Sequence, residues 1–289
     1  GLDALDARPA AADGRGAAAR VTPWSGGIFG SRGRCLLAPN PGMMTLDGTN
    51  TWVLQEPGAS GLVVVDPGPV EDGHLERLTA ELGDVRLVLV THHHFDHAEV
   101  AAELGRRKGC PVRALDPSLC VDAAPLVDGE EIVVDGLALR VVTTPGHTAD
   151  SVSLVLPGDG ALLTGDMVLG RGTTVVAHPD GQLAPYFSSI ERMRSLVVAG
   201  EVRTLWPAHG PVLDDALGVL DFYLAHRRER LAQVERALAE LSVPLSPELA
   251  EDPALPRRVV EVVYADVDPS LWDAAELSVR AQLAYLARR

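Results

Sequence analysis

Residues 91–97 read Thr91-His92-His93-His94-Phe95-Asp96-His97, and they directly follow the apolar run 85–90. Such a run is typical of a strand buried on both faces. Four side chains of the stretch can donate an electron pair to a metal ion: His92, His94, Asp96 and His97. Imidazoles and carboxylates suit zinc and, less selectively, manganese or iron. The stretch therefore predicts a metal site at the end of a strand, against the alternative of a polar loop with chance histidines.

The composition indicates a globular chain with an acidic surface. Of 289 residues, 46% are hydrophobic, enough for one large domain or for a large and a small one. No apolar stretch reaches the roughly eighteen residues of a membrane span, so we expect no membrane partner. The formal net charge is -15, which opposes nonspecific attraction to nucleic acid without excluding a local basic groove.

The N-terminal residues and the cysteines indicate in which cellular compartment the protein resides. Residues 1–20 are rich in Ala, Asp, Gly and Arg and lack the apolar block of a secretory signal, so we expect a flexible tail there. The chain has 3 cysteines, without pair spacing. An odd number of such cysteines is typical of a reducing compartment, which predicts a cytoplasmic protein. The oligomeric state is left open.

Strands and helices alternate from about residue 48 to residue 212. Apolar patterning and turn residues predict strands at 51–54, 62–65, 85–90, 131–134, 137–143, 151–156, 161–164 and 202–206. Helices are expected at 71–82, from Asp96 or His97 to Lys108, and at 188–198. After Gly218 the pattern is helical, with helices at 219–242, 256–267 and 270–289. This organisation predicts an α/β domain over 21–217 and a small helical domain over 218–289.

Four of these strands end at potential metal ligands. The strand 85–90 leads into the histidine-rich stretch, and the other three lead to His147, Asp166 and His209. Ligands in layered α/β folds lie outside the carboxyl ends of the strands, so the four ends can converge. Asp96 with Glu99 also resembles a helix capping box, a structural role that can coexist with metal binding.

The whole pattern resembles the metallo-β-lactamase superfamily of metal hydrolases. The motif His-x-His-x-Asp-His is followed by Gly-His-Thr at 146–148, Gly-Asp at 165–166 and His-Gly at 209–210. The resemblance implies an α/β fold, a four-layer αββα sandwich. It also implies two metal sites joined by a bridging carboxylate: His92, His94 and His147 at the first, Asp96, His97 and His209 at the second, and Asp166 between them.

The resemblance implies a hydrolytic mechanism as well. Two Zn²⁺ ions, with Mn²⁺ or Fe²⁺ as alternatives, would share a bridging hydroxide that attacks a carbonyl carbon or a phosphorus. Asp96 and Asp166 are the expected catalytic carboxylates, with Asp96 accepting a hydrogen bond from the hydroxide. Asp66 matches a family motif whose aspartate orients a ligand histidine, although on its own it reads as a turn residue.

Three longer stretches, 48–52, 144–151 and 165–175, resemble the branch named for β-lactamase-like protein 2. That branch carries a C-terminal winged-helix-like domain. Its animal members cut single-stranded RNA, and its fungal relatives act as thioesterases that release polyketides from carrier proteins. From Gly218 onward the chain has nine arginines against twelve carboxylates, and only 4% of all residues are aromatic. Both features oppose an RNA-binding module.

Three functions stay open from the sequence. They are hydrolysis of single-stranded RNA, hydrolysis of a thioester or other small ester in the manner of hydroxyacylglutathione hydrolase, and non-catalytic binding on the same fold. Arg171, Thr173 and Tyr186 are expected to line the substrate pocket, with solvent exposure of Arg171 and packing of Tyr186 as the alternatives. The other histidines are expected away from the metals, on the surface or in structural roles: His74, His93, His178 and His226.

Overall fold

The computed structural model describes residues 23–71, 73–265 and 268–289. The prediction of a flexible tail at 1–20 lies outside these ranges. Among these residues, none of the helices combines the length with the hydropathy of a membrane-spanning segment.

The first sheet has six strands in the order in which they follow each other along the chain. They are β1 (Gly27–Phe29), β2 (Gly33–Leu37), β3 (Asn50–Leu54), β4 (Leu62–Val65), β5 (Val85–Leu89) and β6 (Val112–Arg113). Pairing is antiparallel from β1 to β4 and parallel from β4 to β6. Strand β4 is buried at every position because both faces of the sheet are covered, which explains its unbroken apolar sequence.

The second sheet has five strands in the order β11-β10-β9-β8-β7. They are β7 (Glu131–Val134), β8 (Leu137–Thr143), β9 (Val152–Leu156), β10 (Ala161–Gly165) and β11 (Thr204–Pro207). The hairpin β7–β8 turns at Asp135 and Gly136, whose φ angles are 49° and 90°. Two successive positive φ angles are what a two-residue hairpin turn requires, so the predicted hairpin signal is explained by its backbone.

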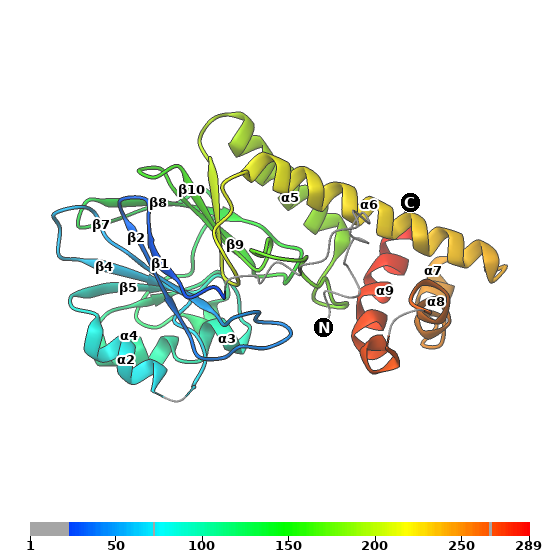
Figure 1. Ribbon diagram of the computed structural model, residues 1–289, viewed down its shortest axis with the longest axis horizontal. Coiled ribbons are helices and arrows are strands. Elements are labelled where there is room, and N and C mark those ends of the chain that lie inside the picture. The colour runs from blue at the N-terminus through cyan, green and yellow to red at the C-terminus, as the bar shows by residue number, and fades with distance from the viewer. Residues whose placement is uncertain (1–22, 72, 266–267) are drawn as a thin grey trace, which may run out of the picture.

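The two sheets pack face to face, and helices cover both outer faces (Figure 1). The core between the sheets contains Trp52, Leu89 and Trp206, with the two indole rings stacked at 4.8 Å. Helices α2 (His74–Glu81) and α4 (Ala101–Lys108) cover the first sheet, and α5 (Leu183–Val198) and α6 (Ala216–Glu240) cover the second. The predicted four-layer sandwich is confirmed.

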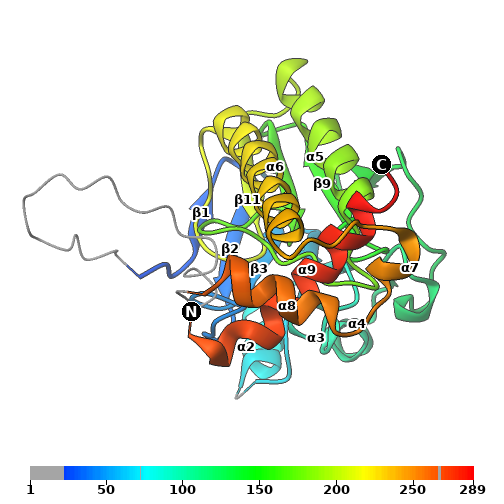
Figure 2. The same ribbon diagram turned by 90° about the vertical axis from the view of Figure 1, so that its right-hand side faces the viewer.

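A small helical domain follows along the second half of α6. Its elements are α7 (Pro247–Ala250), α8 (Leu255–Val263), the short turn η2 (Pro269–Leu271) and α9 (Trp272–Leu286). Helices α8 and α9 pack against each other and against α6 (Figure 2). Since α6 contributes Leu220 to the core of the large domain and Leu238 to that of the small one, the boundary at 217/218 stays a prediction.

Several element predictions need correction. The helix expected from Asp96 to Lys108 is broken into α3 (Phe95–Ala98) and α4. The capping-box prediction is wrong, because His94 occupies the cap position of α3 and the Glu99 carboxylate accepts from the Val70 amide instead. Strands β1, β2 and β6 and the turn η1 (Pro117–Leu119) were not predicted. Helix α5 begins five residues early, and α8 and α9 end before residues 267 and 289.

Candidate metal centre

The four predicted strand ends converge at one edge of the sandwich. The loop after β5 and helix α3 carry the histidine-rich stretch, and the loops after β8, β10 and β11 carry the other candidates. All seven predicted ligands fall into two groups. Within each group, the donor atoms lie within 4.8 Å of one another. These groups are His92, His94, His147 and Asp166, and Asp96, His97 and His209. The structure thus holds a His/Asp cluster able to bind metal.

In the first group, three imidazole nitrogens face one point. Nδ1 of His94 lies 3.0 Å from Nε2 of His92 and 3.1 Å from Nε2 of His147. Oδ2 of Asp166 is 3.6 Å from Nε2 of His147 and 4.0 Å from Nε2 of His92. Ligands at the corners of a tetrahedron with metal bonds of about 2.0 Å are roughly 3.3 Å apart, so these spacings fit one metal ion.

The second group repeats this arrangement on the other side of Asp166. Oδ2 of Asp96 lies 3.1 Å from Nε2 of His209 and 3.4 Å from Nε2 of His97. Oδ1 of Asp166 lies 3.4 Å from Nε2 of His209 and 3.6 Å from Nε2 of His97. One oxygen of Asp166 therefore faces each group, which is the geometry of a bridging carboxylate.

Unpartnered buried atoms support the fit to metal. Within the described part of the chain, Nε2 of His97, Nε2 of His209 and Oδ1 of Asp166 are buried and make no hydrogen bond. Buried polar atoms are almost always partnered, and an exception needs a cause. A cation would satisfy all three atoms at once. The residues present fit a metal ion, although the individual ligand roles stay a prediction.

Hydrogen bonds at the outer edge of each ring set which nitrogen faces inward. Nδ1 of His147 lies 2.7 Å from the Val175 carbonyl oxygen, and Nδ1 of His209 lies 3.1 Å from that of Gly48. A carbonyl only accepts, so each Nδ1 carries the proton and each Nε2 presents its lone pair to the cluster. These contacts orient the rings before any metal binds.

Asp66 fills this outer role for the second group. Its Oδ2 lies 2.9 Å from Nδ1 of His97 and accepts from the Thr91 hydroxyl at 2.7 Å, while Oδ1 accepts from the Thr91 amide at 2.8 Å. The φ angle of Asp66 is 50°, a region that Asp and Asn tolerate. His74, expected at the surface, is instead buried, with Nε2 2.9 Å from the Pro67 carbonyl oxygen. It supports the turn that presents Asp66.

Burial keeps the imidazoles of the first group neutral. Loss of solvent and the neighbouring imidazoles lower the pKa of His94 to about 4 and that of His92 well below its ordinary value. Burial also lowers the pKa of His147, and the nearby Asp166 does not reverse this. Only a neutral imidazole can ligate a metal, so the first group is ready to bind at neutral pH.

Carboxylates dominate the second group. Burial disfavours a charge on His97 and His209, but Asp166 and Asp96 outweigh it and raise both pKa values. Burial would raise the pKa of Asp166, yet the imidazoles of His209 and His97 hold it well below its usual range. The carboxylates and imidazoles of this group thus stabilise each other's charges at close range and largely out of contact with water.

A small hollow adjoins the cluster, with a volume of about 30 Å³. His147 and Asp166 lie on one side of it, and the apolar side chains of Met43, Met44, Leu46, Leu169 and Val175 form much of the rest. Arg171 and Thr173, both predicted for the substrate pocket, line this hollow. Arg171 also lies close to Asp47, with 2.6 Å between Nη2 and Oδ2.

Tyr186 supports the site from behind. Its side chain is fully buried, its hydroxyl donates to the Met167 carbonyl at 2.8 Å, and it does not line the hollow. The packing interpretation of Tyr186 fits this placement, and the prediction of a substrate contact does not. Met167 directly follows Asp166, so the Tyr186 hydroxyl anchors the segment that carries Asp166.

Arg227 is a supporting residue that the sequence did not reveal. It lies on α6 in a segment expected to be solvated, yet only 5% of it is exposed. Its guanidinium donates to the Thr174 carbonyl and stacks over the Tyr186 ring at 5.1 Å. Thr174 precedes Val175, whose carbonyl orients His147. Arg227 thus holds the loop that fixes one imidazole of the first group.

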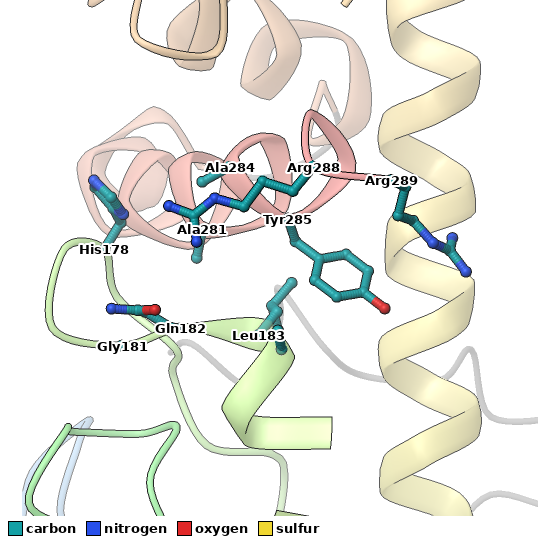
Figure 3. A pocket seen from close by; sticks show the side chains of 10 residues that line it. His178, Gly181, Gln182, Leu183, Ala281, Ala284, Tyr285, Arg288 and Arg289 are labelled. Atoms are coloured by element: carbon teal, nitrogen blue, oxygen red, sulfur yellow. The ribbon is translucent and has the colours of Figure 1, made fainter. Parts of the chain in front are cut away.

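The other histidines lie outside the cluster. His93 is half exposed and turns away, with Nδ1 2.8 Å from Oδ1 of Asp150. A second hollow, of about 200 Å³, lies between the loop before α5 and helix α9 (Figure 3). His178 and Arg288 line it, and none of the seven predicted ligands does. His178 is thus at the surface and not at the metal centre.

Comparison with known proteins defines the class. Residues 44–209 match the family model of the metallo-beta-lactamase superfamily, and residues 256–289 match that of the beta-lactamase associated winged helix domain. The chain therefore belongs to the metallo-beta-lactamase superfamily, whose members are typically metal-dependent hydrolases. Its C-terminal domain is the winged-helix domain that accompanies this fold.

The chain is also similar to individual proteins over most of its length. The chain is 32% identical over 275 residues to the beta-lactamase-like protein 2 homolog of Drosophila melanogaster, which covers 88% of this chain and 87% of that one. It is 32% identical over 213 residues to an atrochrysone carboxyl ACP thioesterase of Cryptosporiopsis sp., covering 71% and 62%. A beta-lactamase domain protein from Burkholderia ambifaria shares the fold, with a TM-score of 0.72, 23% identity and coverage of 93% and 90%.

Proposed function

We propose that this protein hydrolyses a thioester or another small carboxylic ester with the help of two metal ions, of which zinc is the first choice. The observation that carries the proposal is the position of Asp166, whose two oxygens face two separate groups of ligand atoms. In this proposal His92, His94 and His147 hold one ion, and Asp96, His97 and His209 hold the other. Three or four His and carboxylate donors at each position suit zinc.

The two ions would polarise the scissile carbonyl and lower the pKa of a water molecule to near neutrality. The residues of the chain supply the rest. The Asp96 side chain is more exposed than that of Asp166, 28% against 11%, so it is the carboxylate able to accept a hydrogen bond from the attacking water. Hydrolysis joins the water oxygen to the acyl carbon and breaks the bond to sulfur, and the departing thiolate takes up a proton.

The hollow beside the cluster supports an acyl substrate. Methionine and leucine side chains form much of its lining, and among its described residues Arg171 is the one arginine or lysine. Single-stranded nucleic acid requires a row of cations along its backbone and aromatic rings under its bases. Among the described residues, the lining contains no phenylalanine, tyrosine or tryptophan. An acyl chain matches this surface better than a string of phosphates.

Cleavage of single-stranded RNA is the second candidate. It is supported by the similarity to a beta-lactamase-like protein 2 homolog over 88% of the chain, together with the RNA cleavage that the resemblance to that branch implies. It is opposed by the net charge of -15. A non-catalytic binding role on the same fold is the third candidate.

A reducing cytoplasm is the proposed location. Cys35, Cys110 and Cys120 form no disulfide. Unpaired thiols are typical of proteins kept in a reducing compartment.

A parallel assay separates the three candidates. The zinc-loaded protein is given acyl thioesters of N-acetylcysteamine in one series and a labelled single-stranded RNA in the other. The proposal expects thioester turnover that Asp166→Ala abolishes, with no cleavage of RNA. RNA cleavage without thioester turnover would favour the second candidate, and inactivity in both series with two metals bound would favour the third.

A further inference from the structure

The loop formed by residues 39–49 lines one side of the hollow beside the candidate metal centre. We call this loop the roof. It is held together by its own hydrogen bonds: the Asn40 side chain bonds to Thr49, and the Gly42 amide donates to the Leu46 carbonyl. At its base, the Gly48 carbonyl accepts from Nδ1 of His209. At its tip, Met43 and Met44 are more than half exposed. Apolar side chains in such a position are available to cover a ligand.

An ion pair joins this roof to the opposite wall. Nη2 of Arg171 lies 2.6 Å from Oδ2 of Asp47. The same oxygen is buried, and among the described residues it makes no hydrogen bond with suitable angles. The Arg171 side chain is one-third exposed. Contacts of this kind contribute little to stability and are readily exchanged.

The hollow is too small for a substrate while this pair is closed. Its volume of about 30 Å³ has room for little more than a water molecule. Pockets for small ligands enclose about 300–1,000 Å³. Entry of a substrate therefore requires the roof to lift, and lifting it takes Asp47 away from Arg171. The guanidinium is then open to pair with another anion.

We propose that the substrate carries this anion: it is a thioester or ester of a short dicarboxylic acid. Its second carboxylate replaces Asp47 on Arg171, while the side chains of Met43, Met44 and Leu46 cover its methylene groups. Arginine suits this exchange because its planar fork matches a carboxylate. The acyl carbon and the carboxylate must lie within one hollow, since Asp166 and Arg171 both line it. This inference rests on the proposed function and specifies its substrate.

Matched substrates test the inference. The zinc-loaded protein is assayed with the glutaryl and adipoyl thioesters of N-acetylcysteamine, and with the pentanoyl and hexanoyl thioesters of equal chain length. The rate without protein is subtracted. The thiol is uncharged, so the carboxylate is the one charge that differs. We expect kcat/KM to be at least about tenfold higher for the acids, the factor that 1.4 kcal/mol of preferential binding gives.

Substitutions at Arg171 and at Asp47 should act in opposite directions. Arg171→Gln should raise KM for the acidic substrates and reduce the preference to near unity, and Arg171→Lys should retain part of it because the charge persists. Asp47→Asn removes the competing carboxylate and should lower KM for the same substrates. If Asp47 only positions Arg171, Asp47→Asn would raise that KM instead, and the exchange would be overturned.

A second ion pair of the same length provides the control. Nε of Arg194 lies 2.6 Å from Oδ1 of Asp221, between α5 and α6 and away from the hollow. Arg194→Gln and Asp221→Asn should leave the preference unchanged. Equal turnover of acidic and neutral thioesters by the wild-type protein would overturn the inference and leave the proposed function intact. Failure to hydrolyse any thioester with two metals bound would overturn the proposed function.

Discussion

Oδ2 of Asp66 lies 2.9 Å from Nδ1 of His97, and both side chains are buried. The carboxylate accepts a hydrogen bond from the Nδ1–H group of His97, so Nε2 of His97 faces the second group of ligand atoms. The Thr91 amide and hydroxyl hold Asp66 in turn. Asp66, which belongs to neither group of ligand atoms, thus sets the orientation of the His97 ring.

Asp66→Asn is therefore expected to weaken binding of one metal ion. Asn tolerates the φ of 50° at this position, so the turn is kept while the negative charge is lost. Affinity for the ion that Asp96, His97 and His209 would hold should fall about 10–100-fold, as measured by competition with a chromogenic chelator. Asp84→Asn, at an exposed carboxylate, is the control. Equal affinities in the two variants would show that Asp66 does not orient His97.

Arg227 allows a test of whether a residue outside the cluster controls the position of His147. Arg227→Met removes the donor to the Thr174 carbonyl, and the loop that fixes His147 loses its anchor. We expect the affinity for the first metal ion to fall about tenfold or more, since such outer contacts have effects of this size. Arg227→Lys should recover part of the loss.

The neighbouring Arg228 provides the matched control. It is exposed and faces Glu191 at 3.4 Å on the outer surface. Arg228→Met should leave metal affinity unchanged. If both variants lose stability equally in urea and neither loses metal affinity, Arg227 is a packing residue and its link to His147 is refuted.

Gly146 precedes His147 and is required for close packing. Its φ is 147°, and a Cβ there would overlap the backbone of Tyr186. Gly146→Ala should lower the free energy of unfolding by about 2 kcal/mol or more and displace His147. Gly83→Ala, where a Cβ meets no atom within 4 Å, should change stability little. Urea unfolding of the two variants checks this, and similar midpoints would contradict it.

The thiols should differ in reactivity with pH. Burial raises the pKa of Cys35 to about 12, only partly offset by Arg77, and burial raises that of Cys110 as well. Because the thiolate is the reactive form, both should resist iodoacetamide at pH 8, and Cys35 should become reactive only toward its raised pKa. Cys120 is only half-buried and should be alkylated first. Mass spectrometry after brief labelling identifies the modified residue, and early modification of Cys35 would contradict its burial.

Much of the metal centre was accessible from the sequence, because its ligands follow strands. His147, Asp166 and His209 each come within a few residues of a predicted strand end, and carboxyl ends of neighbouring strands meet at one edge. The structure brings all three to the histidine-rich stretch. The sandwich itself followed from the same strands and from the family resemblance.

The supporting residues were not accessible in this way. Arg227 stands in a run of charged residues, which indicates a solvated helix face, and no local pattern tells that a distant loop covers it. His74 was predicted at the surface, and its local sequence likewise does not show the contacts that bury it. The capping box failed because tertiary contacts took Glu99 to the Val70 amide. Strands β1 and β2 are short and each begins with a glycine, so their apolar patterning is weak.

Anomalous diffraction from crystals of the zinc-loaded protein shows directly whether two metal ions bind on either side of Asp166. We expect two peaks about 3.5–4 Å apart. One should be ligated by His92, His94 and His147, and the other by Asp96, His97 and His209, with Asp166 touching both. A single peak, or zinc bound elsewhere with this cluster left without metal, would show that the centre does not hold two ions.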